Sequence, residues 1–154
     1  MREKVHVLGH VISKEGLKTD DKMVMAIKNW VISNNVSELK SFLGAIGYYR
    51  KFINQFVQVA APLTKLLRKG ITFNISKEKT TSFNNLKKCL IKVPILIFPD
   101  YTKQFFNRTD SSKKGLGGVL LQVPGELERP IHFVSRSLSR AERNYSITGR
   151  HSGN

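Results

Sequence analysis

The clearest helical pattern in the chain lies between residues 35 and 53. Its apolar positions recur at intervals of three and four residues, at Leu39, Phe42, Leu43 and Ile46. This spacing is typical of the buried stripe of an amphipathic helix. Asn35, with Glu38 three residues later, is the expected N-cap and capping-box partner. We therefore predict a helix over this segment that packs into a core through its apolar stripe.

A second face of the same predicted helix is small, basic and aromatic. At about 100° per residue it gathers Lys40, Gly44, Gly47, Tyr48 and Lys51. Two glycines inside a helix cost roughly 1 kcal/mol each relative to alanine. Close approach of another backbone would offset that cost. The partner could be a neighbouring helix, against which the glycines would pack, or the groove of a nucleic acid.

Before this helix, alternating apolar residues predict a β-hairpin over residues 4–17, with Leu8-Gly9-His10 at its centre. Thr19 is the expected cap of a short helix over residues 20–30. After the central helix, Pro62 is a favourable first position for another helix, which Gly70 would end.

The second half of the chain predicts one long helix followed by strands. Ser76 would cap a helix reaching about Lys92, with Phe83, Leu86, Leu90 and Ile91 on its inner face. Strands are expected over residues 95–98, 104–109, 116–122 and 130–135, and Ser139 with Glu142 would open a last helix. The fold class is therefore α+β. An N-terminal hairpin and a small helical subdomain occupy residues 1–72, and a connecting helix with an incomplete α/β unit occupies residues 73–154.

Charge and composition narrow the function. Lys and Arg number 26 against 11 acidic residues, and the net charge of +15 divides into +7 for residues 1–72 and +8 for residues 73–154. An excess spread in this way favours contact with a polyanion, most simply nucleic acid. Cys89 is the single cysteine, which excludes a disulfide framework. No apolar run approaches 18 residues, and the N-terminus lacks an apolar signal region, so we expect no membrane partner and an intracellular location, in nucleus or cytoplasm.

Two strings in the first half carry a family resemblance. S-E-L-K-S-F-L-G-A-I-G-Y-Y-R-K-F-I closely resembles the thumb helix of reverse transcriptases from gypsy-type long-terminal-repeat retrotransposons. The resemblance implies that Lys40, Gly44 and Tyr48 contact the minor groove of a primer–template duplex, with Lys51 on the same basic face. L-G-H-V-I-S resembles the hairpin that grips the primer end, which implies nucleic-acid contacts for Leu8, Gly9 and His10.

The second half resembles the start of the RNase H domain in the same polyproteins, through L-I-F-P-D, T-D-S-S-K-K-G-L-G-G-V-L-L-Q and E-R-P-I-H-F-V-S-R-S-L-S-R-A-E-R-N-Y-S. It implies that Asp110 is the first metal-binding and catalytic carboxylate. Two Mg²⁺ ions would need several such ligands. The family's next acid, in a T-E-K-E-type sequence, is replaced by Thr148-Gly149-Arg150-His151. Its other carboxylates, and the polymerase aspartates, would fall outside residues 1–154.

We therefore expect a fragment of a retrotransposon Pol polyprotein that binds an RNA–DNA hybrid or duplex DNA. The rest of the polyprotein is its expected protein partner. Alone, it should bind no Mg²⁺, although the family uses this ion, and it should show neither polymerase nor ribonuclease activity. Two alternatives stay open at this point: a non-catalytic nucleic-acid-binding remnant, and a decayed reading frame.

Overall fold

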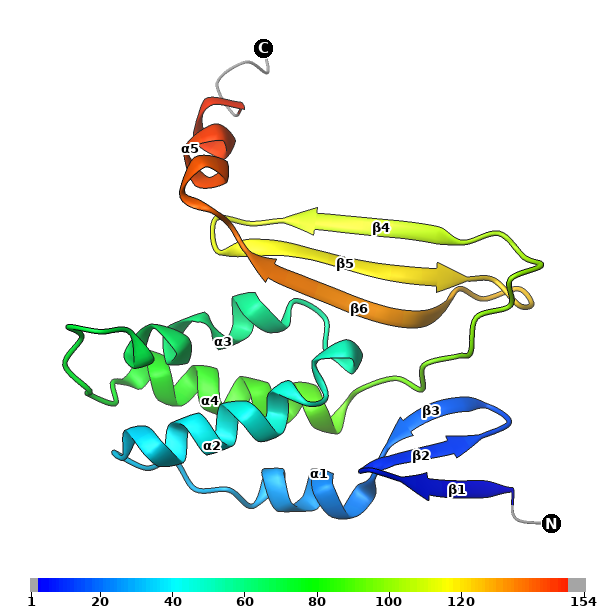
Figure 1. Cartoon of the computed structure of the whole chain (residues 1–154), viewed down its shortest axis with the longest axis horizontal. Helices are drawn as coiled ribbons and strands as arrows, with labels where there is room; N and C mark the ends of the chain where they lie inside the picture. The colour runs from blue at the N-terminus through cyan, green and yellow to red at the C-terminus, as the bar shows by residue number, and fades with distance from the viewer. Residues whose placement is uncertain (1–2, 150–154) are drawn as a thin grey trace.

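The structure, a computed structural model, describes residues 3–149, with side chains as far as residue 144. Two antiparallel three-stranded sheets lie on either side of a layer of helices (Figure 1). Strands β1–β3 and helix α1 lie on one side of α2–α4, and strands β4–β6 lie on the other (Figure 1). This arrangement confirms the predicted α+β class.

The N-terminal sheet has one strand more than the predicted hairpin. It contains β1 (Lys4–Val7), β2 (His10–Ser13) and β3 (Gly16–Thr19), paired in that order. The prediction that Thr19 caps the next helix is wrong, because Thr19 ends β3 opposite His10. Asp20 takes the cap position of α1 (Asp21–Lys28), and its carboxylate accepts a hydrogen bond of 2.9 Å from the Lys22 amide.

The helical layer is built on the predicted apolar stripe. Leu39, Phe42 and Ile46 are all buried in α2 (Val36–Gly47), and the Asn35 side chain caps this helix by accepting from the Ser37 amide. The helix ends earlier than predicted, and the chain turns through a 3₁₀ segment, η1 (Arg50–Phe52). Both Tyr49, before this segment, and Phe52, at its end, are buried.

Two further elements complete the layer after η1. Helix α3 (Phe56–Thr64) begins six residues before Pro62, so the prediction of a helix start at Pro62 is wrong, and a second 3₁₀ segment, η2 (Lys65–Leu67), follows it. Helix α4 (Lys77–Ile91) begins after Ser76 as predicted.

Helix α4 packs on the other helices of the layer. Phe83, Leu86 and Leu90 are buried, and the Phe83 ring lies 4.3 Å from the Phe42 ring. Ile91, which was predicted for the inner face, is 49% exposed.

The division of the chain after residue 72 stays a prediction, since α4 joins the helical core although it follows that boundary.

The second sheet contains β4 (Phe106–Ser111), β5 (Gly115–Gln122) and β6 (Arg129–Ser137), paired in sequence order. The strand predicted over residues 95–98 is reduced to a single bridge. Leu96 exchanges two backbone hydrogen bonds with Leu17 of β3, at 2.7 and 2.9 Å. The next amide, of Ile97, donates to the Pro130 carbonyl of β6 at 2.9 Å. The segment between α4 and β4 therefore bonds to the first sheet through Leu96 and to the second through Ile97.

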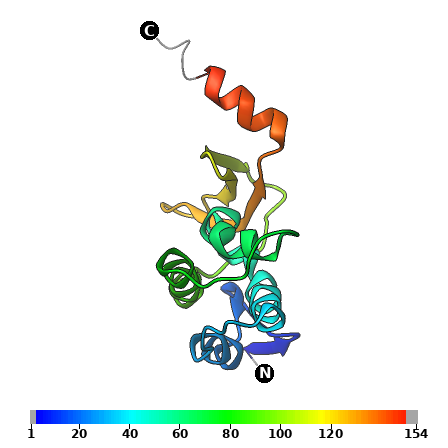
Figure 2. The same cartoon turned by 90° about the vertical axis from the view of Figure 1, so that its left-hand side faces the viewer.

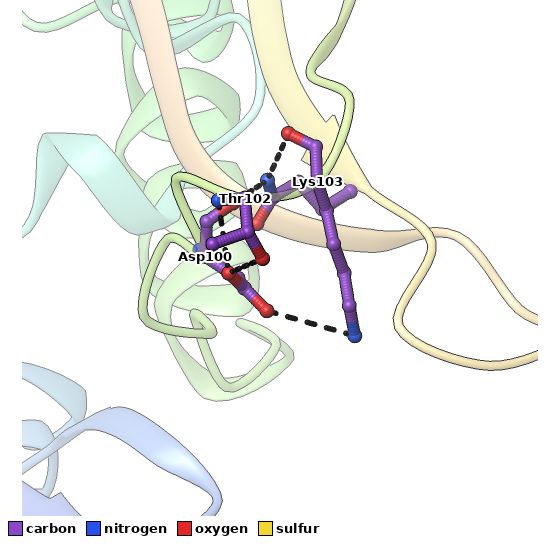
Figure 3. Close-up of polar contacts among 4 residues, drawn as sticks. Asp100, Thr102 and Lys103 are labelled. Atoms are coloured by element: carbon purple, nitrogen blue, oxygen red, sulfur yellow. Dashed lines mark hydrogen bonds and ion pairs between the residues drawn. The ribbon is translucent and has the colours of Figure 1, made fainter.

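A compact turn follows this connector (Figure 3). The Asp100 carboxylate accepts from the amide and the hydroxyl of Thr102, and Lys103 lies 3.7 Å from its other oxygen (Figure 3). These contacts lower the pKa of Asp100 below its usual range. The buried Gln122 amide, at the end of β5, exchanges hydrogen bonds of 2.9 and 2.8 Å with the Asp100 backbone. Gln122 thus fixes the turn to the sheet.

Helix α5 (Arg140–Gly149) projects away from the sheet (Figure 2). Its predicted capping box is confirmed, since the Ser139 amide donates to Glu142 at 2.8 Å and the Glu142 amide donates to the Ser139 hydroxyl at 3.2 Å. Arg136 donates two further bonds to the same carboxylate, and together these partners lower the pKa of Glu142 to about 2. Arg150 and His151, the last two of the four residues that stand in place of the T-E-K-E-type sequence, lie outside the described residues.

Candidate nucleic-acid interface

The turn between β1 and β2 is held against the end of α2. Leu8 and Gly9 both have positive φ, of 48° and 77°, which identifies a two-residue type I′ hairpin turn. The Tyr48 hydroxyl donates to the Leu8 carbonyl at 2.6 Å, and the Tyr49 hydroxyl donates to the Gly9 carbonyl at 2.8 Å. Two consecutive tyrosines therefore join two segments that the sequence separates by 40 residues.

His10 lies inside this junction. It is 8% exposed and contacts the rings of Tyr48, Tyr49 and Phe52. Burial lowers the pKa of the His10 imidazole, and the nearby Lys51 ammonium lowers it further. The His10 imidazole is therefore a buried, neutral ring that packs beneath the turn between β1 and β2.

The face of α2 that carries Lys40, Gly44 and Tyr48, called here the α2 face, is open. Lys40 and Gly44 are exposed, and Tyr48 is half exposed. A Cβ atom added at Gly44 would meet no atom within 4 Å among the described residues, outside the backbone of its own helix. The alternative that Gly44 packs on a neighbouring helix is therefore wrong for the described part of the chain.

Lys51 reaches the same region from a different element. The prediction that one helix carries Lys51 with Lys40 is wrong, because α2 ends at Gly47 and Lys51 lies in η1. Lys51 instead lines a groove of about 530 Å³ between the end of α2 and strand β6. The groove is lined by Gly47, Tyr48, Arg50, Lys51, His132, Phe133, Val134 and Ser135.

The groove adds two residues, Arg50 and His132, that the sequence reasoning did not select. The Arg50 guanidinium donates to the Ser135 carbonyl at 2.7 Å and lies over the Phe56 ring. Burial and the Lys51 charge lower the pKa of His132. Arg50 directly precedes Lys51 in the thumb-like string, and His132 lies within the second motif, but only the fold brings them together.

Asp110 lies apart from this groove, on β4. Its Oδ2 atom accepts a hydrogen bond of 2.7 Å from the side-chain amide of Gln55, the residue that precedes α3. The described residues contain no group of three or more His, Cys, Asp or Glu side chains that could hold a metal ion. A pair of Mg²⁺ ions requires several carboxylate ligands. The described residues therefore do not fit the two-metal site that the resemblance implies.

Taken with this geometry, comparison with known proteins identifies the family. Residues 75–152 match the family described as "RNase H-like domain found in reverse transcriptase". The chain belongs to this family.

Full-length relatives are transposon polyproteins. The chain is 41% identical to the retrovirus-related Pol polyprotein from transposon opus and 34% identical to that from transposon gypsy, both of Drosophila melanogaster. These matches cover 93% and 97% of the chain but 15% of each relative. The resemblance to gypsy-type Pol polyproteins is confirmed, and the chain spans a small part of their length.

A solved structure supports the same fold. The foamy viral protease-reverse transcriptase in complex with dsDNA is matched over 98% of this chain and 33% of that chain, with a TM-score of 0.79 at 21% identity.

No helix in the described part of the chain is long and apolar enough to cross a bilayer.

Proposed function

We propose that this chain binds duplex nucleic acid, either an RNA–DNA hybrid or duplex DNA, as the thumb and adjoining part of a retrotransposon reverse transcriptase. The observation that carries the proposal is the open space at Gly44 between Lys40 and Tyr48. A glycine there lets the helix axis approach the sugar edges of a minor groove. The dsDNA bound by the foamy viral relative supports this choice of ligand.

Electrostatics extend the proposed contact beyond α2. Lys51 and Arg50 line the groove that begins beside Tyr48, so cationic side chains continue from the α2 face to strand β6. Phosphate contacts by such residues release counterions, and the affinity then falls steeply with salt concentration. An affinity independent of salt would refute this part of the proposal.

We propose further that the role of this chain is non-catalytic and that it binds no Mg²⁺ at Asp110. The Gln55 hydrogen bond already occupies one carboxylate oxygen of Asp110. Mg²⁺-dependent cleavage of an RNA–DNA hybrid should therefore be undetectable above background. Cleavage that disappears in Asp110→Asn would contradict the proposal.

Three variants of the α2 face test the binding mode. Gly44→Leu should weaken binding to a hybrid and to duplex DNA by more than Lys40→Ala does, because a side chain at residue 44 would hold the helix away from the groove. Gly44→Ala is the matched control for helix propensity, since alanine favours the helix by about 1 kcal/mol with a smaller side chain. Binding by fluorescence anisotropy and melting by circular dichroism are measured on the same samples.

The two measurements separate folding from binding. We expect both Gly44 variants to melt at or above the wild-type temperature, because the site is open. Lys40→Ala should mainly reduce the dependence of log affinity on log salt by about one unit, as for one lost phosphate contact. Gly44→Leu that binds as wild type would overturn the proposed docking of the α2 face.

A further inference from the structure

A second basic site lies away from the α2 face, where three separate segments meet. Helix α3 and η2 form one wall, the β4–β5 turn forms another, and the end of β6 with the start of α5 forms the third. The pocket encloses about 150 Å³. Its cationic residues are Lys65, Arg68, Lys113, Lys114 and Arg143.

The lining of this pocket contains no acidic side chain to balance its cationic residues. None of the ten lining residues, which also include Val57, Ala61, Thr64, Ser137 and Leu138, is acidic. Within the described part of the chain, Lys65, Arg68, Lys113 and Lys114 take part in none of the ion pairs. The carboxylate closest in sequence, Glu142, is already bound by Arg136. Like charges gathered in this way repel one another, and a bound anion would relieve the repulsion.

The size and walls of the pocket limit the ligand. Sites for drug-sized molecules begin at about 300 Å³, so a nucleobase with its sugar would not be enclosed here. A phosphate group is small, and Lys and Arg are its usual partners. The β4–β5 turn is fixed by backbone bonds, with the Lys114 amide donating to the Ser112 hydroxyl at 3.2 Å and the Ser112 amide donating to the Gly115 carbonyl at 2.9 Å. Lys113 and Lys114 are thus held at the rim.

We propose that this pocket binds a backbone phosphate of the same nucleic acid and forms a second anchoring point, remote from the α2 face. The inference rests on the proposed function for its choice of ligand. Helix α3 has nine residues and spans about 14 Å. It separates Lys51, before its start, from Lys65, after its end. This length is less than one turn of a DNA duplex, about 34 Å, so the proposal places both contacts on one duplex.

A pair of double variants tests this pocket. Lys113→Ala with Lys114→Ala removes two lining charges, and Lys28→Ala with Lys88→Ala is the matched control, because both control lysines are exposed on other helices. Binding of a DNA duplex is measured at several salt concentrations. We expect the slope of log affinity against log salt to fall by about two units in the pocket variant, with the control close to wild type.

The result separates the pocket from the α2 face. If both double variants lose the same amount of duplex affinity, the loss is a general effect of charge, and the proposed phosphate site is refuted. If Gly44→Leu weakens binding while the pocket variant binds as wild type, the pocket fails and the proposed function survives. If wild-type protein binds no duplex, the proposed function is refuted, and the proposed phosphate site in the pocket is refuted with it.

An arm with inorganic phosphate distinguishes the source of the ligand. Amide resonances of Lys113, Lys114 and Gly115 should shift when duplex is added to wild-type protein. Shifts with inorganic phosphate alone, and none with duplex, would mean that the pocket takes a free anion and would overturn the backbone-phosphate site. The melting temperature of the pocket variant should stay at or above wild type, since removing like charges relieves repulsion.

Discussion

Replacing Leu8 by asparagine should make this protein more stable and should weaken its binding to nucleic acid. Leu8 has φ of 48°, the left-handed region, and its side chain is 83% exposed. A branched apolar residue is unfavourable there, whereas Asn-Gly is the preferred pair for a type I′ turn. Strain of this kind is common at functional sites, and Leu8 is one of the residues that the primer-grip resemblance selects.

The size of the effect follows from the local contacts. The left-handed conformation costs roughly 1–2 kcal/mol for an ordinary L-residue and less for asparagine. The hydrogen bond from the Tyr48 hydroxyl uses the Leu8 backbone carbonyl and survives the change. An exposed side chain contributes little burial, so we expect a net gain of about 1 kcal/mol in the free energy of unfolding. In a chain of this size that raises the melting temperature by about 2–4 °C.

Leu8→Ala is the control, because it removes the same side chain but leaves a residue strained in the left-handed region. Thermal and urea unfolding should rank Leu8→Asn above both Leu8→Ala and wild type. Equal stability of the two variants would refute the assignment of strain to this turn. Duplex binding should weaken in both variants if the exposed leucine touches the ligand, and wild-type affinity in both would remove Leu8 from the proposed interface.

Four further outcomes are expected. Gly16→Ala should destabilise the fold by about 2–3 kcal/mol in urea unfolding, because glycine has φ of 134° there and a Cβ would lie 2.1 Å from the Leu96 carbonyl oxygen; wild-type stability would contradict the bridge. Gln122→Leu should cost about 2 kcal/mol, since it leaves buried hydrogen-bonding groups unpaired; a neutral result would show that water replaces the amide. Ionised Glu142 has a pKa of about 2 in the fold against an ordinary 4.5, so its contribution to α5 is complete above pH 4.5 and is lost as the pH falls toward 2; Glu142→Gln should remove that part of the acid dependence of helicity. Asp110→Asn should keep an acceptor for Gln55 and melt as wild type, whereas Asp110→Ala should melt lower; equal melting would deny the contact a structural role.

Much of the fold could be predicted because local periodicity and capping agree with the tertiary packing. The α2 stripe is buried as predicted, and α4 and α5 begin at the residues whose caps were recognised. Strands β5 and β6 also lie close to their predicted ranges. In each case a short stretch of sequence contains the whole signal.

The errors fall where distant residues decide the structure. The outer edge of the third strand, β3, is bridged by Leu96, which lies 79 residues after Leu17. The burial of His10 could not be predicted locally, because the Tyr48 and Tyr49 rings that pack on it come from a distant segment of the chain. The pattern of residues 35–53 placed Lys51 on α2, whereas the helix ends at Gly47 and Lys51 lies in η1. No local pattern contains these contacts.

The contacts between the helical layer and the second sheet explain how an interface could extend over both. Around the start of α3, Arg50 donates to the Ser135 carbonyl, the Val57 amide donates to the Ser135 hydroxyl, and Gln55 donates to Asp110. Gln55 has a φ of 54° at the start of α3, and its side-chain amide donates to Asp110 of β4. These bonds hold β4 and β6 against α3 and so fix the groove beside β6 relative to the basic pocket that runs along α3. A duplex that engages both would meet a surface already set in place, which lowers the entropic cost of binding. The contact of Asp110 with Gln55 therefore also helps to position the proposed nucleic-acid interface.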